Sequence, residues 1–509
     1  MFGAFGHLLH LARVGFVLTR EGVLGLVPPA RIPVLARPLL WIARLVERRN
    51  SGGRAARIMA ALTRLGPSYV KLGQFLATRP DIVGVSLARD LEGLQDRMPA
   101  FPQAAAEAEI AEALGKPVSE LFTRFGPPVA AASIAQVHEA EIRLEDGSAR
   151  RVAVKVLRPG IRALFRRDIA AQAYVARLIE RFVPAARRLK PVDVVATLAR
   201  TVELEMDLRF EAAALSEMAE NTAGDLDFHV PQVDWATSGR TSLTMDWIDG
   251  IKLTDLAALD AAGIDRVALA DIVLQSFLRH ALRDGFFHAD MHQGNLFATR
   301  EGKLVAVDLG IMGRMGANER RFLAEILFGF IQRDYRRIAE VHFEAGYVPK
   351  HHSVEAFAQA LRAVGEKIHG RNAAEISMAE LLGLLFEITG LFDMATRIEL
   401  VLLQKTLVVV EGVSRSLNPH FNMWKTSEPV LRDWIERNLG PVGRIEEAGR
   451  DVVTLLRTAK HLPGFVERGE AFFEKAEQGR AQSHSRNDRS MPFFLGVIAL
   501  LLAAIFFRL

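Results

Sequence analysis

The chain has 509 residues, half of them hydrophobic, which is enough for two or more domains with a substantial core. Charged residues make up 24% of the chain, and this excludes a disordered protein. The net charge of +4 is too small to indicate a nucleic-acid-binding protein, although an isoelectric point of about 9.3 suits an anionic membrane surface. The absence of cysteine excludes disulfides, thiolate metal sites and cysteine nucleophiles, and fits a reducing compartment.

Both ends of the sequence are rich in hydrophobic residues. Residues 1–26 are interrupted by charged and histidine side chains, which predicts an amphipathic helix that lies on a membrane or packs on the protein itself. Residues 491–507 carry no charge and would span roughly 25 Å as a helix, at the short end for a transmembrane segment. Because a polar, arginine-containing stretch precedes it, this run is predicted to be a membrane anchor rather than a core helix, with the main domain on the cytoplasmic side.

Between these ends, hydrophobic periodicity predicts short strands among long helical stretches. Helices are predicted over residues 54–125, 163–222, 263–285 and 317–470. Strands are predicted over residues 137–144, 151–157, 243–248, 296–299 and 304–308. Asp146-Gly147 is a strong turn signal between the first two strands, and residues 286–295 are predicted to form a loop.

This order of elements predicts an α+β protein, in which a small β-rich lobe with helical insertions precedes a helical lobe. The predicted parts are an apolar and basic lead-in (1–53), a helical extension (54–125), the β-rich lobe (126–250), the helical lobe (251–475), a polar linker (476–490) and a transmembrane helix (491–508).

The first candidate functional residue is Lys155, at the end of the apolar strand sequence Val152-Ala153-Val154-Lys155. A lysine at this place can project over a nucleotide and bind its phosphates as a point charge. The pattern alone is weak, because most such lysines are simply exposed to solvent.

The second candidate is the loop His288-Ala289-Asp290-Met291-His292-Gln293-Gly294-Asn295. The spacing of Asp290 and Asn295 is that of a kinase catalytic loop, where the aspartate orients or deprotonates an attacking hydroxyl or water and the asparagine supplies an oxygen to Mg²⁺. The alternation of His288, Asp290 and His292 leaves a zinc or iron site as an alternative.

The third candidate is Asp308, which begins the sequence Asp308-Leu309-Gly310 directly after an apolar strand. A carboxylate at a strand end is a natural ligand for Mg²⁺. A lysine on a strand, the Asp290–Asn295 loop and Asp308 occur in the kinase order, so together they predict a site for ATP and Mg²⁺.

A glycine-rich phosphate loop of the G-x-G-x-x-G type is missing. Alanine restricts the positive φ and the close backbone approach that glycine permits, so nucleotide would sit differently here. Backbone N–H groups and the Ser133 hydroxyl could still bind phosphates, and a plain small-residue turn is the alternative. The predicted nucleotide-binding segment is Ala130, Ala131, Ala132, Ser133, Ile134, Ala135, Gln136, Val137 and His138.

On these residues the chain resembles the UbiB family of atypical protein-kinase-like proteins over roughly residues 55–420. Residues 67–74 (PSYVKLGQ) match the family's KxGQ signature, and residues 130–138 match its alanine-rich loop, with Ala135 where glycine is common. Residues 205–207 (EMD) match its ExD motif. The resemblance implies a two-lobed kinase-like fold with a helical N-terminal extension and a C-terminal transmembrane anchor, which uses ATP and Mg²⁺.

The resemblance also implies residue roles. Asp290, Lys155 and Glu211 would be catalytic, with Glu211 as the ion-pair partner of the lysine, and Asn295 and Asp308 would hold the metal. In the family, the segment that matches Lys71 folds over the active site and pairs with the ExD carboxylates, which would close the cleft to peptides. The regulatory residues would then be Lys71, Gly73, Gln74, Glu205 and Asp207.

Since Glu205 and Asp207 are two residues apart, a helix would place them about 200° apart, and one of them would point at the nucleotide pocket.

The function implied by the resemblance is that of a membrane-anchored ATPase that supports ubiquinone biosynthesis at a bacterial inner membrane. Its partners would be isoprenoid-quinone precursors or membrane lipid and other proteins of ubiquinone biosynthesis, with no nucleic acid, and a homodimer is an option. The alternatives are a protein or small-molecule kinase with Asp290 as the base, and a nucleotide-binding scaffold without enzymatic activity. A quinone hydroxylase is not indicated, since no Rossmann glycine pattern is present.

Overall fold

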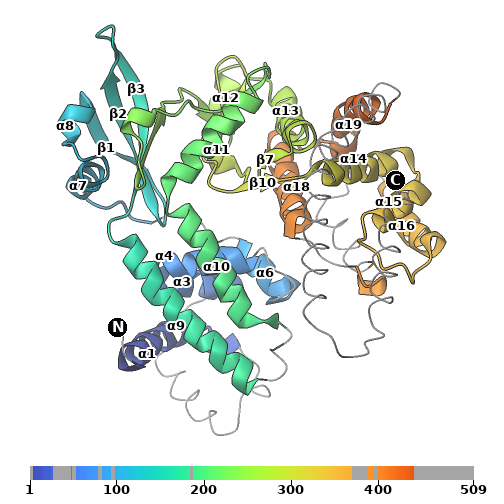
Figure 1. The fold of residues 1–509 in the computed structure, drawn as a ribbon, viewed down its shortest axis with the longest axis horizontal. Helices are drawn as coiled ribbons and strands as arrows, with labels where there is room; N and C mark the ends of the chain where they lie inside the picture. The colour runs from blue at the N-terminus through green and yellow to red at the C-terminus, as the bar shows by residue number, and fades with distance from the viewer. Residues whose placement is uncertain are drawn as a thin grey trace, which may run out of the picture. The chain divides into compact units, whose positions relative to one another are not determined.

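The computed structural model is shown in Figure 1. It describes residues 4–26, 47–48, 53–77, 83–92, 94, 98–183, 187, 189–369, 388, 390–394 and 398–440. The chain divides into two units, Met1–Trp434 and Ile435–Leu509, and the second is described for residues 435–440 only. The predicted linker (476–490) and transmembrane helix (491–508) lie outside the described residues. Within the described ranges, no helix has the length and apolarity needed to cross a membrane.

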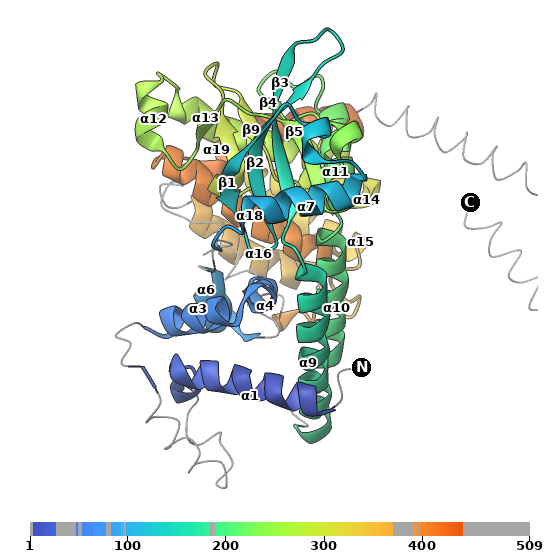
Figure 2. The same ribbon diagram turned by 90° about the vertical axis from the view of Figure 1, so that its left-hand side faces the viewer.

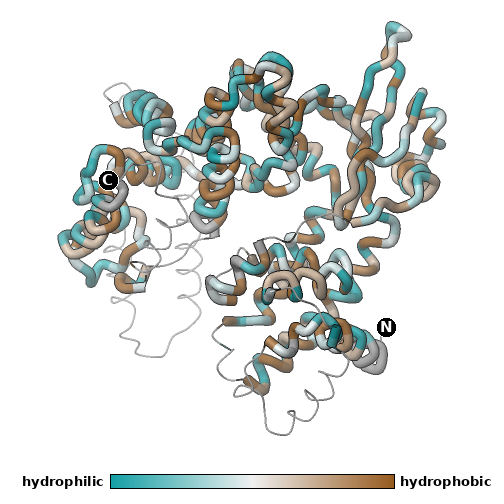
Figure 3. Tube along the Cα trace, turned by 180° about the vertical axis from the view of Figure 1, so that it is seen from behind, coloured by the Kyte–Doolittle hydropathy of each residue, from teal (hydrophilic) through white to brown (hydrophobic). Residues whose placement is uncertain are grey.

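Apart from α12, the main helices of the described residues fall in the predicted helical stretches or in the helix predicted over residues 1–26. They are α1 (Ala4–Arg20), α3 (Arg54–Leu65), α4 (Pro67–Ala77), α6 (Val85–Glu92), α7 (Gln103–Leu114), α8 (Val118–Leu121), α9 (Ile161–Phe182), α10 (Pro191–Glu205), α11 (Leu208–Asn221), α12 (Leu256–Ala261), α13 (Arg266–Arg279), α14 (Ala317–Gln332), α15 (Tyr335–Glu344), α16 (Val354–His369), α18 (Ile398–Leu417) and α19 (Met423–Leu439). Figure 3 shows hydrophobic and hydrophilic residues alternating along these helices, as expected for helices with one buried face.

The strands form three small sheets with the orders β1-β2-β3-β5, β4-β9-β8-β6 and β10-β7. Their bounds are β1 (Arg124–Ala131), β2 (Ala135–Arg143), β3 (Ala149–Leu157), β4 (Phe228–His229), β5 (Ser242–Asp246), β6 (Ile251–Lys252), β7 (Phe286–His288), β8 (Leu296–Ala298), β9 (Leu304–Ala306) and β10 (Met312–Arg314).

The first sheet is antiparallel and carries a hydrophobic core on one face. Helix α7 lies across that face in Figure 2, and Ile110 of α7 is packed with Val152, Val154 and Val156 of β3. At the far end of the β2–β3 hairpin, Gly147 has a φ of +84° and the Ser148 N–H donates to Asp146, so the predicted turn is confirmed.

Strand β1 is an element that the sequence pattern did not indicate. It was hidden by two prolines, Pro127 and Pro128, which remove backbone donors and are depleted in strands. An edge strand tolerates proline, and β1 is an edge strand whose pairing with β2 shifts register around Pro128. The first residues of the alanine-rich segment therefore belong to β1.

The N-terminal helices are fastened to α9 through Asp168, whose side chain is buried. The Ser68 hydroxyl of α4 donates to one Asp168 oxygen, and the other lies 3.4 Å from the His10 Nε2 of α1 and 2.9 Å from the Arg167 Nε. His10 also lies 3.0 Å from the Tyr69 hydroxyl. The amphipathic helix predicted over residues 1–26 is thus α1, and it packs on α3 and α9 of its own protein (Figure 2).

Candidate active site

Lys155, the lysine predicted to bind nucleotide phosphates, lies on the sheet face opposite α7. Side chains alternate along a strand, and since Val154 and Val156 face α7, Lys155 between them faces the other way. There its Nζ lies 2.7 Å from Glu211 Oε1 and 3.1 Å from Asp308 Oδ2. The expected Lys155–Glu211 ion pair is therefore confirmed, and Lys155 also joins the β-rich lobe to the predicted metal ligand.

The position of Glu211 follows from the way α11 begins. Asp207 is the N-cap residue of this helix, and its carboxylate accepts a hydrogen bond from the Arg209 N–H. Glu211 then falls one turn into the helix, where it is buried and its two oxygens lie 2.7 and 2.9 Å from the Lys155 ammonium. A capped helix start thus fixes the partner of the lysine.

Burial and the charges of the neighbouring groups together shift the pKa values of these three groups. Burial lowers the pKa of Lys155, but Asp308 and Glu211 outweigh it and hold the pKa above its usual value. Burial raises the pKa of Asp308, yet Lys155 reverses this and keeps the carboxyl group ionised. Burial raises the pKa of Glu211 to about 7, because the favourable charge of Lys155 compensates only in part. Glu211 is therefore the group of the three that titrates near neutrality.

Residues Phe286–His288 form strand β7, which pairs with β10, so the loop predicted over residues 286–295 begins only after His288. The Asp290 N–H donates to Nδ1 of the buried His288, and the Asn295 side-chain amide donates to the Asp290 carbonyl oxygen at 3.4 Å. The Val307 N–H bonds to the Asn295 carbonyl oxygen at 3.0 Å, which places Asn295 beside the strand that leads to Asp308. Asp308 Oδ1 accepts from the Gly310 N–H at 3.0 Å. The hairpin β8–β9 thereby brings both predicted metal ligands to one end.

Two side chains of α18 that the sequence pattern did not indicate lie next to this loop. Lys405 Nζ is 3.6 Å from Asp290 Oδ1, and the buried Thr406 hydroxyl donates to the Ala289 carbonyl oxygen at 3.1 Å. Helix α18 is held against α13 by the Ser414 hydroxyl, which donates to the Ala270 carbonyl oxygen. The feature of the sequence that could have indicated Lys405 is a lone charged residue in a mostly apolar helix, Leu402-Leu403-Gln404-Lys405-Thr406-Leu407.

The predicted alanine-rich loop is divided by its strands. Val137 pairs with Lys155 across the β2–β3 hairpin and so shares its sheet face. Gln136 and His138 point the opposite way and are buried, where the Gln136 side chain bonds to both backbone groups of Phe101 and to His138. Strand alternation thus places Gln136 and His138 on the core side, away from the lysine face.

Arg158 holds the turn between β1 and β2, residues 132–134. The Arg158 guanidinium donates to the carbonyl oxygens of Ala132 and Ser133, and the Arg158 N–H donates to the Ile134 carbonyl oxygen at 2.7 Å. The same guanidinium lies 5.2 Å from the centre of the Phe101 ring. The Ser133 side chain is fully buried in this turn.

The KxGQ helix, α4, contacts the ExD segment directly. Lys71 Nζ lies 2.8 Å from Glu205 Oε2 at the last residue of α10, and both side chains are largely buried. A Cβ on Gly73 would lie 2.5 Å from Leu94 Cδ1, so a larger residue here would have to displace that side chain. The Gln74 side chain donates to the Leu94 carbonyl oxygen at 3.4 Å.

The two ExD carboxylates have different surroundings. Glu205 is near enough to Glu211 to raise its pKa, so it belongs to the electrostatic environment of the lysine pair. Asp207 instead caps α11 and pairs with Arg209 at 2.7 Å and Arg240 at 3.5 Å. The helix ends between them, so the 200° separation expected on a continuous helix does not apply.

The alternative metal site at His288, Asp290 and His292 is not supported by the geometry. Among the described residues, the donor atoms of three His, Asp or Glu side chains lie within 4.8 Å of one another in a different group. That group is His351, His352 and Asp393. His288 is buried, and its Nδ1 accepts the Asp290 N–H.

The sheet lobe carries Lys155 paired with Glu211, and the loop with Asp290 and Asn295 lies beside it. This is the arrangement of an atypical kinase-like protein. Residues 93–342 match the model of the ABC1 atypical kinase-like domain, and residues 361–422 match that of the UbiB helical domain.

Curated relatives support the same assignment over most of the chain. A probable protein kinase UbiB of Marinobacter nauticus is 38% identical over 85% of this chain and 79% of its own length. The proteins of the same description from Azotobacter vinelandii (40% identical, 80% and 76%) and Aeromonas salmonicida (36% identical, 97% and 93%) agree. The chain therefore belongs to the UbiB family of atypical kinase-like proteins.

The fold is also found in a solved structure. Rv3197 of Mycobacterium tuberculosis, solved in complex with erythromycin, superposes with a TM-score of 0.50 at 23% sequence identity, over 78% of this chain and 97% of its own. At that identity the similarity concerns the fold.

Proposed function

We propose that this protein is a Mg²⁺-dependent, ATP-using enzyme that supports ubiquinone biosynthesis, with ATP hydrolysis as its basic reaction. The observation that carries the proposal is the position of Lys155, within 3.1 Å of both Glu211 and Asp308. A lysine paired with a helix glutamate and facing a metal-binding aspartate is the arrangement that phosphoryl transfer requires.

Mg²⁺ fits the donors at the end of the β8–β9 hairpin. Mg²⁺ takes oxygen ligands, and Asp308 offers carboxylate oxygens, one of them fixed by the Gly310 N–H. The Asn295 amide nitrogen is engaged by the Asp290 carbonyl oxygen, so its side-chain oxygen is the atom suited to a cation. Bound Mg²⁺-ATP supplies the transferable phosphoryl group, and Lys155 binds its phosphates.

The loop residues act on the acceptor. Asp290 accepts a hydrogen bond, and then the proton, from the attacking water or hydroxyl group. Lys405 adds a positive charge 3.6 Å from that carboxylate, on the acceptor side, where it can offset the negative charge of the transferred phosphoryl group. We propose that Lys405 compensates this charge. The loop itself has no lysine between Asp290 and Asn295 that could do so.

The acceptor is proposed to be small. The ion pair of Lys71 with Glu205 fastens α4 to the end of α10, next to the helix that carries Glu211. This contact supports water or a small lipid-derived hydroxyl as acceptor over a peptide. Isoprenoid-quinone precursors or membrane lipid are the proposed ligands, and a bacterial inner membrane is the proposed location.

The cellular test uses a strain that lacks this protein and is complemented with variants. Wild-type protein should restore ubiquinone, whereas Asp308→Asn and Asp290→Asn should not, although they accumulate to the same level. Normal ubiquinone in both variants would refute the proposal.

A kinase that phosphorylates a hydroxyl group is a second candidate, because Asp290 and Lys405 form a suitable acceptor site. Transfer of labelled phosphate from ATP to an acceptor in membrane extracts, lost in Asp290→Asn, would favour this function over hydrolysis. ATP binding without turnover or transfer under any lipid condition would favour a non-enzymatic scaffold.

A further inference from the structure

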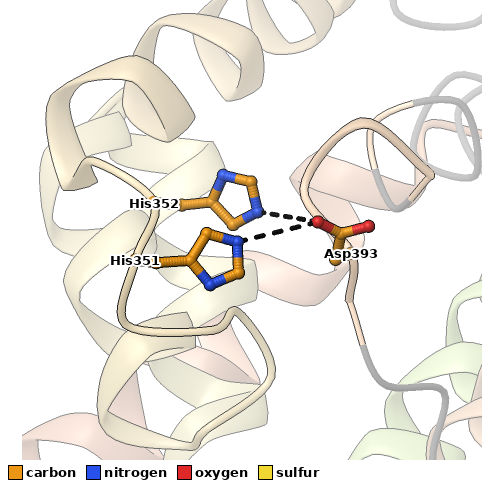
Figure 4. A group of neighbouring side chains, drawn as sticks. All are labelled: His351, His352 and Asp393. Carbon is orange, nitrogen blue, oxygen red and sulfur yellow. Dashed lines mark hydrogen bonds and ion pairs between the residues drawn. The ribbon is translucent and has the colours of Figure 1, made fainter.

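Three metal-ligand side chains converge far along the chain from the candidate active-site loop, as Figure 4 shows. His351 and His352 lie between α15 and α16, and both point their Nε2 atoms at the carboxylate of Asp393. The distances to the same oxygen, Asp393 Oδ2, are 3.7 Å from His351 and 3.2 Å from His352. The two imidazole rings lie side by side, with centroids 4.2 Å apart.

This spacing fits a bound metal ion. With Zn–N bonds of about 2.0–2.1 Å and Zn–O bonds of about 2.0–2.2 Å, neighbouring ligand atoms of a tetrahedral site lie roughly 3.3 Å apart. The two His–Asp separations of 3.2 and 3.7 Å bracket this value, and the three donor atoms lie within 4.8 Å of one another. Small movements of exposed side chains would bring all three onto one ion.

Two of the three side chains, His352 and Asp393, are positioned by contacts that lead to the protein core. The His352 ring packs on Phe392 at 5.2 Å, and Phe392 packs edge-on against the buried Phe357 of α16 at 4.9 Å. Phe392 therefore anchors the residue that follows it, Asp393. The Asp393 backbone has a φ of +49°, an uncommon conformation for a residue other than glycine, and it presents the carboxylate to the histidines.

We propose that His351, His352 and Asp393 form a binding site for a divalent transition metal ion such as Zn²⁺. Two imidazoles exclude Mg²⁺ and Ca²⁺, which take oxygen ligands, and one carboxylate with two imidazoles suits zinc. His351 and Asp393 are 67% and 69% exposed, so solvent would complete the coordination. The ion would join the loop before α16 to the segment around Phe392.

The test uses untagged full-length protein in detergent, stripped of metal with a chelator and free of nucleotide. We expect one equivalent of Zn²⁺ to bind in titration calorimetry and to raise the thermal unfolding midpoint. Co²⁺ in its place should give the visible absorption of a tetrahedral site. His352→Ala and Asp393→Ala should each weaken Zn²⁺ binding by at least about tenfold.

Two control variants make the result specific. His420→Ala removes an exposed histidine outside the cluster, and Asp308→Asn removes the carboxylate proposed to bind Mg²⁺; both should bind Zn²⁺ like the wild type. The proposal is overturned if His352→Ala and Asp393→Ala bind as tightly as the wild type, or if binding needs millimolar Zn²⁺. Since no readout depends on ATP, failure here leaves the proposed ATP chemistry untouched.

Discussion

At the scale of single residues, the candidate site depends on charges that compensate one another. Lys155 is shared by Glu211 and Asp308, and Lys405 faces Asp290 from another element. Each carboxylate that would contact metal, nucleotide or acceptor thus has a cation beside it. Two predictions follow from these pairs, one for Lys405 and one for Glu211.

Replacement of Lys405 should slow catalysis more than it weakens nucleotide binding. We expect Lys405→Ala to lower kcat for ATP turnover by about tenfold with little change in KM, since its charge acts near Asp290, on the acceptor side. Lys405→Arg keeps the charge and should retain most of the rate. Equal rates in wild type and Lys405→Ala would show that this lysine has no role in turnover.

The rate of ATP turnover should fall in acid because of Glu211. Its pKa is raised to about 7, so below that pH the protonated carboxyl no longer holds Lys155 by charge. This folded-state pKa lies above the ordinary glutamate pKa of 4.5, so the stability that Glu211 contributes is complete below pH 4.5 and is lost as the pH rises through about 7. A pH–rate profile should therefore show a limb near pH 7 that is absent from the residual activity of Glu211→Gln. An unchanged limb in Glu211→Gln would assign it to another group.

The residue types that carry the proposed chemistry could be predicted because their spacing is local. Asp290 and Asn295 belong to one loop, and Asp308 follows one hairpin later. Lys405 could not be predicted in this way, because only the packing of α18 on α13 brings it to Asp290. The alanine-rich pattern predicts Gln136 and His138 in the nucleotide site with their neighbours, but strand alternation places their side chains on the core face.

At the scale of elements, a few polar side chains connect segments that are distant in the sequence. Asp168 joins α9 to α4 and α1, whereas Arg158 holds the hairpin turn between β1 and β2. Strand β1 was missed because its prolines are typical of loops, and only an edge position allows them. Neither the edge position nor these long-range contacts can be seen in a local sequence pattern.

The contacts of Asp168 should contribute measurably to the stability of the N-terminal helices. Asp168→Ala leaves the buried Ser68 hydroxyl and His10 without their shared acceptor, and we expect a loss of about 3 kcal/mol in the free energy of unfolding. Asp249→Ala is the matched control, because its pair with Arg151 is exposed and should change stability by less than about 1 kcal/mol. Thermal unfolding and limited proteolysis within residues 1–77 would measure both. Equal stability of the two variants would contradict this assignment.

At the scale of the whole molecule, the family assignment rests on matches that span both lobes, residues 93–342 and 361–422. Membrane attachment remains a prediction from the uncharged run at residues 491–507, which lies outside the described residues.

The membrane prediction can be tested by removal of that run. A chain that ends at residue 476 should leave the membrane fraction, because an uncharged run long enough to span a bilayer is removed. Retention of the shortened chain on membranes would instead point to α1 or another surface as the attachment.

The central claim is that Lys155, Asp290, Asn295 and Asp308 form a site for Mg²⁺-ATP chemistry. The most direct measurement is ATP turnover by the purified full-length protein in lipid vesicles, with and without Mg²⁺, for the wild type and Asp308→Asn. The claim predicts Mg²⁺-dependent turnover by the wild type that falls by at least about a hundredfold in Asp308→Asn, since the metal ligand is lost. Turnover that is independent of Mg²⁺, or equal in the two proteins, would contradict it.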